Sequence, residues 1–263
     1  MTEQSDRASR LSVVDVSLRF AGIRALDGVS LDVDAGERLG LVGPNGAGKT
    51  TLLDCIAGSV SPDRGRILLD GDDVTRAPMH RRARRGLGRT FQRVGLFAEM
   101  TVREHLVVAE RAHGGVHALV GDLVGRGRTV PAEIARSDEI LGRLGIGALA
   151  DAPVEALTLG QARLVEVARA LATEPTVLLL DEPSSGLDRR ETAALADTLR
   201  GVQDDHDVAI VLVDHDLELV EGFTERCVVL DFGRVIAAGP PADVLADPAV
   251  RAAYLGEPVE AVS

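Results

Sequence analysis

Residues 43–50 read Gly43-Pro44-Asn45-Gly46-Ala47-Gly48-Lys49-Thr50. This run fits the pattern of a phosphate-binding loop, in which a glycine and four further residues precede Gly-Lys-Ser or Gly-Lys-Thr. Lys49 is the only lysine in the chain, which otherwise uses arginine for its permanent positive charges. An ammonium is a compact charge that reaches the β- and γ-phosphates of a nucleotide, where a planar guanidinium would not fit. Binding of phosphate therefore accounts for a lysine at this position, whereas the arginine-rich composition of the chain does not.

The segments on both sides of this loop support the same interpretation. Residues 37–42 predict a strand that enters the loop, and residues 51–57 predict a helix that leaves it, beginning near Gly48. Glycines let backbone N–H groups face phosphate oxygens, and a helix N-terminus presents its positive end to the anion. We therefore expect residues 43–51, Thr51 included, to bind nucleotide phosphates and the Thr50 hydroxyl to ligate Mg²⁺. The alternative is a glycine-rich turn with an incidental lysine.

Length and charge limit the classes of function. The chain has 263 residues and a formal net charge of −12, which suits one large α/β domain, or a domain with a subdomain, and argues against nonspecific binding to nucleic acid. No apolar stretch is long enough to span a bilayer, and residues 1–7 lack the apolar core of a signal peptide. We therefore expect a cytoplasmic protein, for which any membrane role would come through a partner. Cys55 and Cys227 lie in apolar patterns without metal-ligand spacing, which predicts buried free thiols.

Strand and helix patterns alternate along most of the chain. Helical apolar spacing predicts a mostly helical region from about residue 91 to 173, in which the glycine-rich residues 114–129 form an insertion loop. The whole pattern predicts an α/β fold with a mostly parallel central sheet, interrupted by a helical subdomain. The expected strands cover residues 11–20, 29–33, 65–70, 176–180, 208–213 and 227–230, and the expected helices cover residues 102–112, 131–144, 161–172, 189–200 and 216–221.

A second nucleotide motif ends the strand expected at residues 176–180. Val177-Leu178-Leu179-Leu180-Asp181-Glu182 is an apolar run that ends in two carboxylates. Such a run predicts a buried parallel strand that delivers Asp181 to the edge of the sheet where a phosphate-binding loop places Mg²⁺. We expect Asp181 to hold the metal and Glu182 to polarise the water that attacks the γ-phosphate. A strand that simply ends in acidic turn residues is the alternative.

The segment Leu157-Thr158-Leu159-Gly160-Gln161-Ala162-Arg163 narrows the class of nucleotide-binding protein. A kinase, a GTPase or an ATPase would all fit a phosphate-binding loop, but no lysine remains for the Asn-Lys-x-Asp motif that usually recognises guanine. The segment resembles the LSGGQ signature of ATP-binding-cassette (ABC) ATPases. A short polar turn opens a long helix here, so N–H groups and a hydroxyl face outward at a helix N-terminus. The resemblance implies that Thr158, Gly160 and Gln161 complete the ATP site of an opposing subunit.

Further positions follow the ABC pattern, and their roles are implied by the resemblance. Phe20 corresponds to the aromatic side chain that stacks on adenine, although a role in the core is the alternative. Gln92 resembles the glutamine that contacts Mg²⁺ and the attacking water. His215 resembles the switch histidine that reaches the γ-phosphate. Residues 185–188, Ser-Gly-Leu-Asp, resemble the loop that contacts the other ATPase subunit.

The resemblance covers residues 11–256 and narrows to one group of transporters. Residues 85–92, 96–102 and 253–257 are similar to ATPase subunits of branched-chain amino-acid uptake transporters and their urea or amide relatives, in which an insertion such as 114–129 is also typical. This resemblance implies a single ABC domain at 11–256, with a nucleotide-binding core at 11–91 and 174–240, an antiparallel β subdomain, a helical subdomain at 92–173 and a helical tail at 241–263. ATP and Mg²⁺ are the implied cofactors.

The implied partners are transmembrane permease subunits, a second ABC ATPase subunit and, indirectly, a solute-binding protein. Such a subunit would lie on the inner face of the cell membrane and power uptake of a small solute, most simply an amino acid. An exporter ATPase for lipid or drug shares the same chemistry and stays an alternative, as does a non-transport ABC ATPase.

Two features depart from the simplest expectation. The signature segment carries Leu159 where relatives usually have glycine or tyrosine, while Thr158 keeps the hydroxyl of the usual serine. The arginine cluster at residues 81–85 suggests either an anionic partner or a solvated helix face, and the acidic net charge of the chain favours the solvated face.

Overall fold

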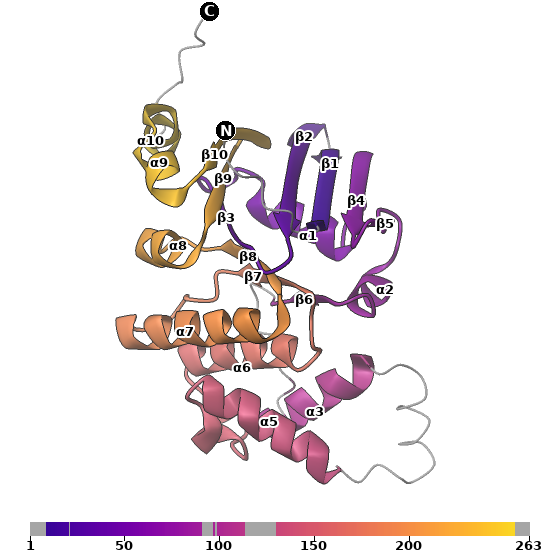
Figure 1. Cartoon of the computed structure of the whole chain (residues 1–263), viewed down its shortest axis with the longest axis vertical. Helices are drawn as coiled ribbons and strands as arrows, with labels where there is room; N and C mark the ends of the chain where they lie inside the picture. Colours follow the sequence, from indigo (N-terminus) through magenta and orange to yellow (C-terminus); the bar gives the residue numbers. More distant parts are fainter. Residues whose placement is uncertain (1–8, 21, 91–96, 98, 114–129, 256–263) are drawn as a thin grey trace, which may run out of the picture.

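The structure is a computed structural model that describes residues 9–20, 22–90, 97, 99–113 and 130–255 (Figure 1). Its larger sheet has six strands in the order β10-β9-β3-β8-β7-β6. All neighbouring strands are parallel except β10, which runs antiparallel to β9. The strands are β3 (Arg38–Val42), β6 (Leu87–Arg89), β7 (Val177–Asp181), β8 (Ala209–Val213), β9 (Arg226–Asp231) and β10 (Arg234–Gly239).

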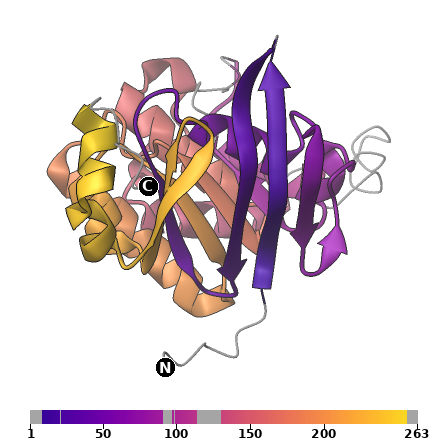
Figure 2. The same cartoon turned by 90° about the horizontal axis from the view of Figure 1, so that it is seen from above.

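A second, antiparallel sheet has the order β2-β1-β4-β5. Helix α1 (Lys49–Ala57) packs between the two sheets, and Leu52 and Ile56 lie fully buried in the same apolar cluster as Leu41 of β3 and Leu11 of β1. Figure 2 shows the two sheets side by side when the molecule is seen from above. The strands are β1 (Ser9–Phe20), β2 (Ile23–Asp34), β4 (Arg64–Leu69) and β5 (Asp72–Asp73).

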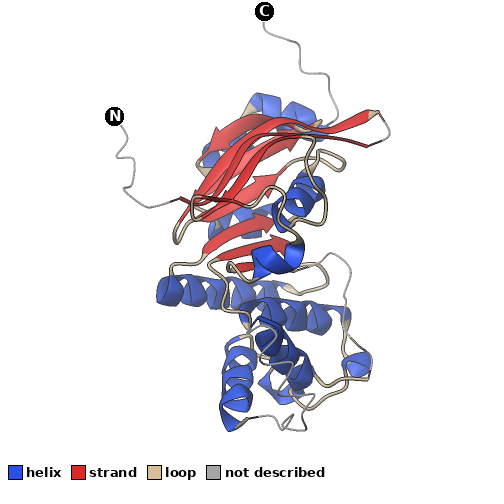
Figure 3. Cartoon of the chain, turned by 90° about the vertical axis from the view of Figure 1, so that its right-hand side faces the viewer, coloured by secondary structure: helices blue, strands red, loops and turns tan. Residues whose placement is uncertain are grey.

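Helices α6, α7 and α8 cover the other face of the larger sheet, and α3 and α5 pack with α6 in a helical lobe. A second apolar cluster joins that face, including Val42, to α6, α7 and α8. Figure 3 shows the helical lobe at the end of the molecule opposite the antiparallel sheet. No helix in the described ranges is long and apolar enough to cross a membrane. The helices are α2 (Met79–Ala83), α3 (Val102–His113), α5 (Pro131–Arg143), α6 (Leu159–Leu171), α7 (Arg189–His206), α8 (Leu217–Phe223), α9 (Pro241–Ala246) and α10 (Pro248–Leu255).

The predicted fold class is confirmed, and every strand and helix predicted within the described residues is present. The two free cysteines are buried, as expected, and burial raises the pKa of the Cys55 thiol to about 11. Sequence patterns missed the short strands β5, β6 and β10, because two to six residues hold too few alternations to show a period. The insertion predicted at residues 114–129 lies outside the described residues.

The interpretation of residues 81–85 as a solvated helix face is wrong for Arg82. Its side chain is 1% exposed and its guanidinium donates to four backbone carbonyls. Two of these, at Cys55 and Ile56, belong to the last turn of α1, at 2.6 and 2.7 Å. A cation is favourable there because the carbonyls at a helix C-terminus have no intrahelical donors. Arg82 therefore fastens α2 to the end of the helix that leaves the phosphate-binding loop.

We expect Arg82→Met to lower the free energy of unfolding by about 2–4 kcal/mol, since it leaves buried carbonyls without their charged donor. Urea denaturation followed by circular dichroism would measure the change. Arg81, on the same short helix, is exposed, so Arg81→Met should change stability by less than about 0.5 kcal/mol. Equal effects of the two substitutions would contradict the anchoring role of Arg82.

Candidate nucleotide-binding site

The loop between β3 and α1 has the backbone of an anion site. Helix α1 begins at Lys49 after Gly48, which has a φ of 106° and provides no side-chain cap. A side chain at position 48 would be strained by this φ, and its Cβ would lie 2.7 Å from the carbonyl oxygen of Ala25. The first N–H groups of α1 have no intrahelical acceptors and no capping side chain. They are thus available to an anion such as a phosphate.

Lys49 lies inside this loop. Its side chain is 7% exposed, and its Nζ donates to the carbonyls of Gly43 at 2.7 Å and Pro44 at 3.0 Å. Burial lowers the pKa of the Lys49 ammonium from its ordinary value, while the charges of Glu182 and Asp181 oppose that shift. Two N–H groups of the ammonium hold the loop, and the third can donate to a phosphate oxygen.

Asp181 is the residue whose surroundings fit Mg²⁺. It ends β7 and is 1% exposed, yet neither carboxylate oxygen has a hydrogen-bond partner among the described residues. Burial raises the pKa of the Asp181 carboxyl, and Arg89, whose Nη2 lies 3.6 Å from Oδ2, opposes the rise. Buried carboxylate oxygens without donors are costly, and a hard cation that takes oxygen ligands would remove that cost.

The donor set suits a metal held partly by substrate. The described residues contain no group of three or more histidine, cysteine, aspartate or glutamate side chains that could enclose a metal. Mg²⁺ typically takes one or two protein oxygens and completes its shell with water and phosphate. Asp181 and Thr50, which is half-buried at the start of α1, are the residues that would hold it. Gln92, predicted as a further contact to metal and water, lies outside the described residues.

Glu182 and His215 meet at the carboxyl edge of the parallel sheet. Asp181 is paired with Val213 in the ladder between β7 and β8, so the residues that follow both strands emerge together. His215 Nε2 lies 3.0 Å from Glu182 Oε1. The backbone of Glu182 has a φ of 51°, a left-handed conformation that costs about 1–3 kcal/mol in a residue with a side chain, and its N–H donates to Val213 at 2.7 Å. The structure thus brings together the predicted base and the predicted switch histidine.

Asp214 is a residue of this edge whose role the sequence patterns did not reveal. It is 4% exposed and accepts hydrogen bonds from Ser184 N at 3.1 Å, Ser184 Oγ at 2.7 Å and Asp216 N at 2.9 Å. These bonds join the loop after Glu182 to the turn that carries His215. A buried strand that ends in Val213-Asp214-His215 was the available signal, but only the fold shows that Ser184 is the partner.

The signature turn is built as a helix cap. Thr158 precedes α6, its Oγ1 accepts from Gln161 N at 3.2 Å, and Gln161 Oε1 accepts from Thr158 N at 3.0 Å. Gly160 is buried, and a Cβ there would lie 2.7 Å from the carbonyl oxygen of Gly186. Among the described residues, the hydrogen bonds of this turn are thus internal, and Gly160 borders Gly186 and Leu187 rather than the phosphate loop of the same chain. Leu159 is 58% exposed beside Gly186.

Phe20 lies at the surface rather than in the core. It ends β1, pairs with Ile23 of β2, and is 48% exposed. Two residues past Ile23, the carbonyl of Ala25 borders Gly48 of the phosphate loop. The hairpin that carries Phe20 therefore passes beside the loop, and the alternative role of Phe20 in the core does not hold.

Comparison with known proteins identifies the family. A family model described as "ABC transporter" matches residues 26–185, which is more than half of the chain. The chain belongs to the ABC transporter ATPase family. A second model, "Branched-chain amino acid ATP-binding cassette transporter", matches residues 234–260.

Relatives and solved structures agree with this assignment. The branched-chain amino-acid transport ATP-binding protein BraF of Pseudomonas aeruginosa is 36% identical over 94% of this chain and 98% of its own length. The lipopolysaccharide export system ATP-binding protein LptB of Haemophilus influenzae is 33% identical over 95% of this chain and 98% of its own length. A nucleotide-free ATP-binding cassette of an ABC transporter superposes with a TM-score of 0.82 at 29% identity, covering 95% of this chain and 100% of that structure. The chain is thus an ATPase with the ABC fold.

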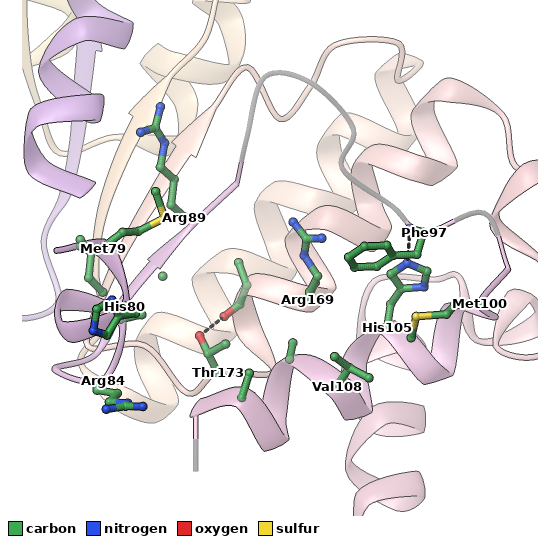
Figure 4. Close-up of a pocket in the computed structure, with 16 residues that line it drawn as sticks. Met79, His80, Arg84, Arg89, Phe97, Met100, His105, Val108, Arg169 and Thr173 are labelled. Carbon is green, nitrogen blue, oxygen red and sulfur yellow. Dashed lines mark hydrogen bonds between the residues drawn. The ribbon is translucent and has the colours of Figure 1, made fainter. Parts of the chain in front are cut away.

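This ABC ATPase also has a cavity of about 380 Å³ that lies apart from the phosphate loop, between the core and the helical lobe (Figure 4). Its walls come from α2, β6, α3 and α6, and include Met79, His80, Val108 and Thr173. At one end Phe97, 64% exposed, stacks on His105, whose Nε2 accepts from Phe97 N at 2.8 Å. His105 is 2% exposed, and its Nδ1 lies 2.9 Å from the carbonyl of Thr101.

Proposed function

We propose that this chain is the ATP-hydrolysing subunit of an importer for branched-chain amino acids or a similar small solute. The buried carboxylate of Asp181 at the sheet edge supports hydrolysis of Mg·ATP, because its oxygens accept no hydrogen bond from the described residues and the Arg89 guanidinium, 3.6 Å away, leaves room for a metal ion to bind them. The C-terminal match to the branched-chain amino-acid model and the similarity to BraF support import of that class of solute.

The residues divide the chemistry between binding and proton transfer. Lys49 and the N–H groups at the start of α1 bind the phosphates, while Thr50 and Asp181 hold Mg²⁺. Bound Mg²⁺ supplies positive charge that offsets the developing charge on the phosphates. Glu182 accepts the proton of the attacking water, and His215, 3.0 Å from Glu182, orients that carboxylate and reaches toward the γ-phosphate.

The active unit is a pair of ATPase subunits, either two copies of this chain or this chain with a paralogue. Thr158, Gly160 and Gln161 lie at the start of α6, where Thr158 is exposed and, among the described residues, the turn bonds to itself and borders Gly186 rather than the phosphate loop of its own chain. In the pair, this turn faces the γ-phosphate bound by the other subunit. The Thr158 hydroxyl oxygen accepts a hydrogen bond from Gln161 N, so its own O–H can donate to a phosphate oxygen.

Transmembrane permease subunits hold the pair at the inner face of the membrane. We place their contact at the cavity between the core and the helical lobe, where exposed Phe97, Met79 and Val108 offer apolar surface. Closure and reopening of the ATPase pair then drive alternating access in the permease. A solute-binding protein takes part only indirectly, and no nucleic acid is involved.

An exporter is the second candidate, because LptB, named for lipopolysaccharide export, is 33% identical. This chain can be affinity-purified from native membranes and the co-purifying proteins identified. This experiment distinguishes an importer from an exporter. Recovery of a solute-binding protein with the permease, together with uptake of labelled leucine or valine in reconstituted vesicles, would establish import. A complex without a binding protein that extracts lipid would overturn it.

Phe20→Ala should weaken ATP binding by about 1–2 kcal/mol, or roughly 5- to 30-fold in Kd, if the ring stacks on adenine. Hydrolysis at saturating ATP should stay near the wild-type rate because no catalytic atom changes. Calorimetric titration with a non-hydrolysable ATP analogue gives the affinity. Ile23→Ala is the matched control, since Ile23 is the 74% exposed partner of Phe20 across the hairpin. Equal affinity of wild type and Phe20→Ala would assign adenine to another residue.

A further inference from the structure

One side chain of the C-terminal helix touches the phosphate loop. The hydroxyl oxygen of Tyr254, in α10, accepts a hydrogen bond from the backbone N–H of Gly43 at 2.9 Å. Gly43 is buried and is the first residue of the loop. Its N–H precedes those at the start of α1, so Tyr254 and a phosphate do not compete for the same donor.

Gly43 is held from several directions at once. Its carbonyl accepts from Lys49 Nζ at 2.7 Å, and its Cα faces the carbonyl of Leu230 so closely that a Cβ would clash. With a φ of 143°, the residue also has a conformation that favours glycine. The bond to Tyr254 therefore fixes the point at which β3 turns into the phosphate loop, at the residue whose carbonyl holds the Lys49 ammonium.

The same C-terminal part of the chain holds the other end of the loop. The turn between β9 and β10 places Gly233, whose N–H donates to the carbonyl of Ala47 at 2.9 Å. Val244 of α9 and Val250 of α10 are 4% and 1% exposed, so both helices are packed into the core. Residues 226–255 thus contact the loop at its beginning and near its end.

We propose that Tyr254 is a positioning residue that sets the geometry of the phosphate loop and couples nucleotide binding to docking of α10. The inference rests on the nucleotide site of the proposed function. With Tyr254 in place, Gly43 and Lys49 are held in the arrangement in which the N–H groups of α1 converge on one anion. By linkage, nucleotide must strengthen the docking of α10 by the same factor as the docked helix strengthens nucleotide binding.

Tyr254→Phe tests the contribution of the hydroxyl alone. The ring is 40% exposed, so removing its oxygen leaves the packing of α10 in place. Loss of one hydrogen bond to a buried N–H should raise the Kd for Mg·ADP and for a Mg-bound non-hydrolysable ATP analogue by about 3- to 10-fold. KM for ATP should rise with it, while kcat changes less than about twofold, because the catalytic groups are untouched. Arg251→Gln, an exposed change on the same helix, should leave Kd and KM unchanged.

The composition of the chain allows a direct view of this contact. Tyr254 is the only tyrosine and the chain has no tryptophan, so 3-fluorotyrosine labelling of the full chain gives a single ¹⁹F resonance. We expect the non-hydrolysable ATP analogue to shift this resonance in the wild-type chain. It should not do so in Lys49→Ala, which lacks the ammonium that binds the phosphates. This measurement keeps the hydroxyl of Tyr254, because the label replaces only one ring hydrogen by fluorine.

The outcomes separate the inference from the function on which it rests. A resonance that stays unchanged while calorimetry shows nucleotide bound, or a Tyr254→Phe variant with wild-type Kd and KM, overturns the positioning role and leaves the ATPase assignment intact. Failure of the wild-type chain to bind Mg-nucleotide would overturn the proposed site itself, and with it the role of Tyr254.

Discussion

Glu182→Gln is expected to reduce ATP hydrolysis by about 10²- to 10⁴-fold and to preserve ATP binding. The amide keeps the shape of the side chain and can still bond to His215, which lies 3.0 Å from the carboxylate, but it cannot accept a proton from water. Lys49, Thr50 and Asp181 are unchanged, so Mg·ATP still binds. In the proposed cycle, closure needs bound ATP and reopening needs hydrolysis, so the variant should accumulate as an ATP-bound pair of subunits.

Phosphate release and size-exclusion chromatography with Mg·ATP measure the two effects. Glu218→Gln is the matched control: Glu218 also lies at this edge of the sheet but is 83% exposed, and its replacement should leave hydrolysis unchanged. If the natural pair includes a paralogue, the chromatography is repeated with that co-purified subunit. Retained hydrolysis together with the absence of an ATP-dependent pair in both forms would refute the composite site.

Lys49→Ala should lose nearly all affinity for ATP, with a Kd increase of about 10²-fold or more, because the phosphates lose their charged donor and two loop carbonyls lose theirs. Lys49→Arg should not restore binding, since a planar guanidinium cannot take the place of the buried ammonium. Calorimetry gives the Kd values, and circular dichroism checks that both variants are folded.

A labelling experiment provides an independent measure of the same site. Lys49 is the only lysine, so an amine-reactive reagent can modify only Lys49 and the α-amino group. Mg·ATP should protect Lys49 from modification. Wild-type affinity in Lys49→Ala, or equal labelling with and without nucleotide, would place the nucleotide elsewhere.

The sequence predicted the parts of the site that are local in the chain. A strand, a glycine-rich loop and a helix are consecutive between residues 37 and 57, so their periodicity and composition are visible without tertiary information. The same holds for Asp181 at the end of an apolar run and for the capped helix at Thr158, and the structure has both features as expected.

Contacts between distant segments were beyond the reach of these patterns. Arg82 looked like one member of an exposed basic cluster, and only the approach of α2 to the end of α1 shows that its guanidinium is buried among carbonyls. Asp214 and Ser184 are joined because β7 and β8 are adjacent in the sheet. A single polar side chain belongs to no repeating pattern of the sequence, so the neighbouring residues do not reveal its partner in the fold.

The sequence by itself determined the α/β fold, the phosphate loop and the order of the nucleotide motifs, because each motif, strand or helix pattern is formed by neighbouring residues and their order is the order of the chain. Only the tertiary structure decided that Asp181 lacks hydrogen-bond partners among the described residues, that Glu182 faces His215, and that Tyr254 reaches Gly43 across 211 positions of sequence. Burial and hydrogen bonding depend on which segments the folded sheet brings together, and that proximity is a property of the whole chain rather than of any one stretch.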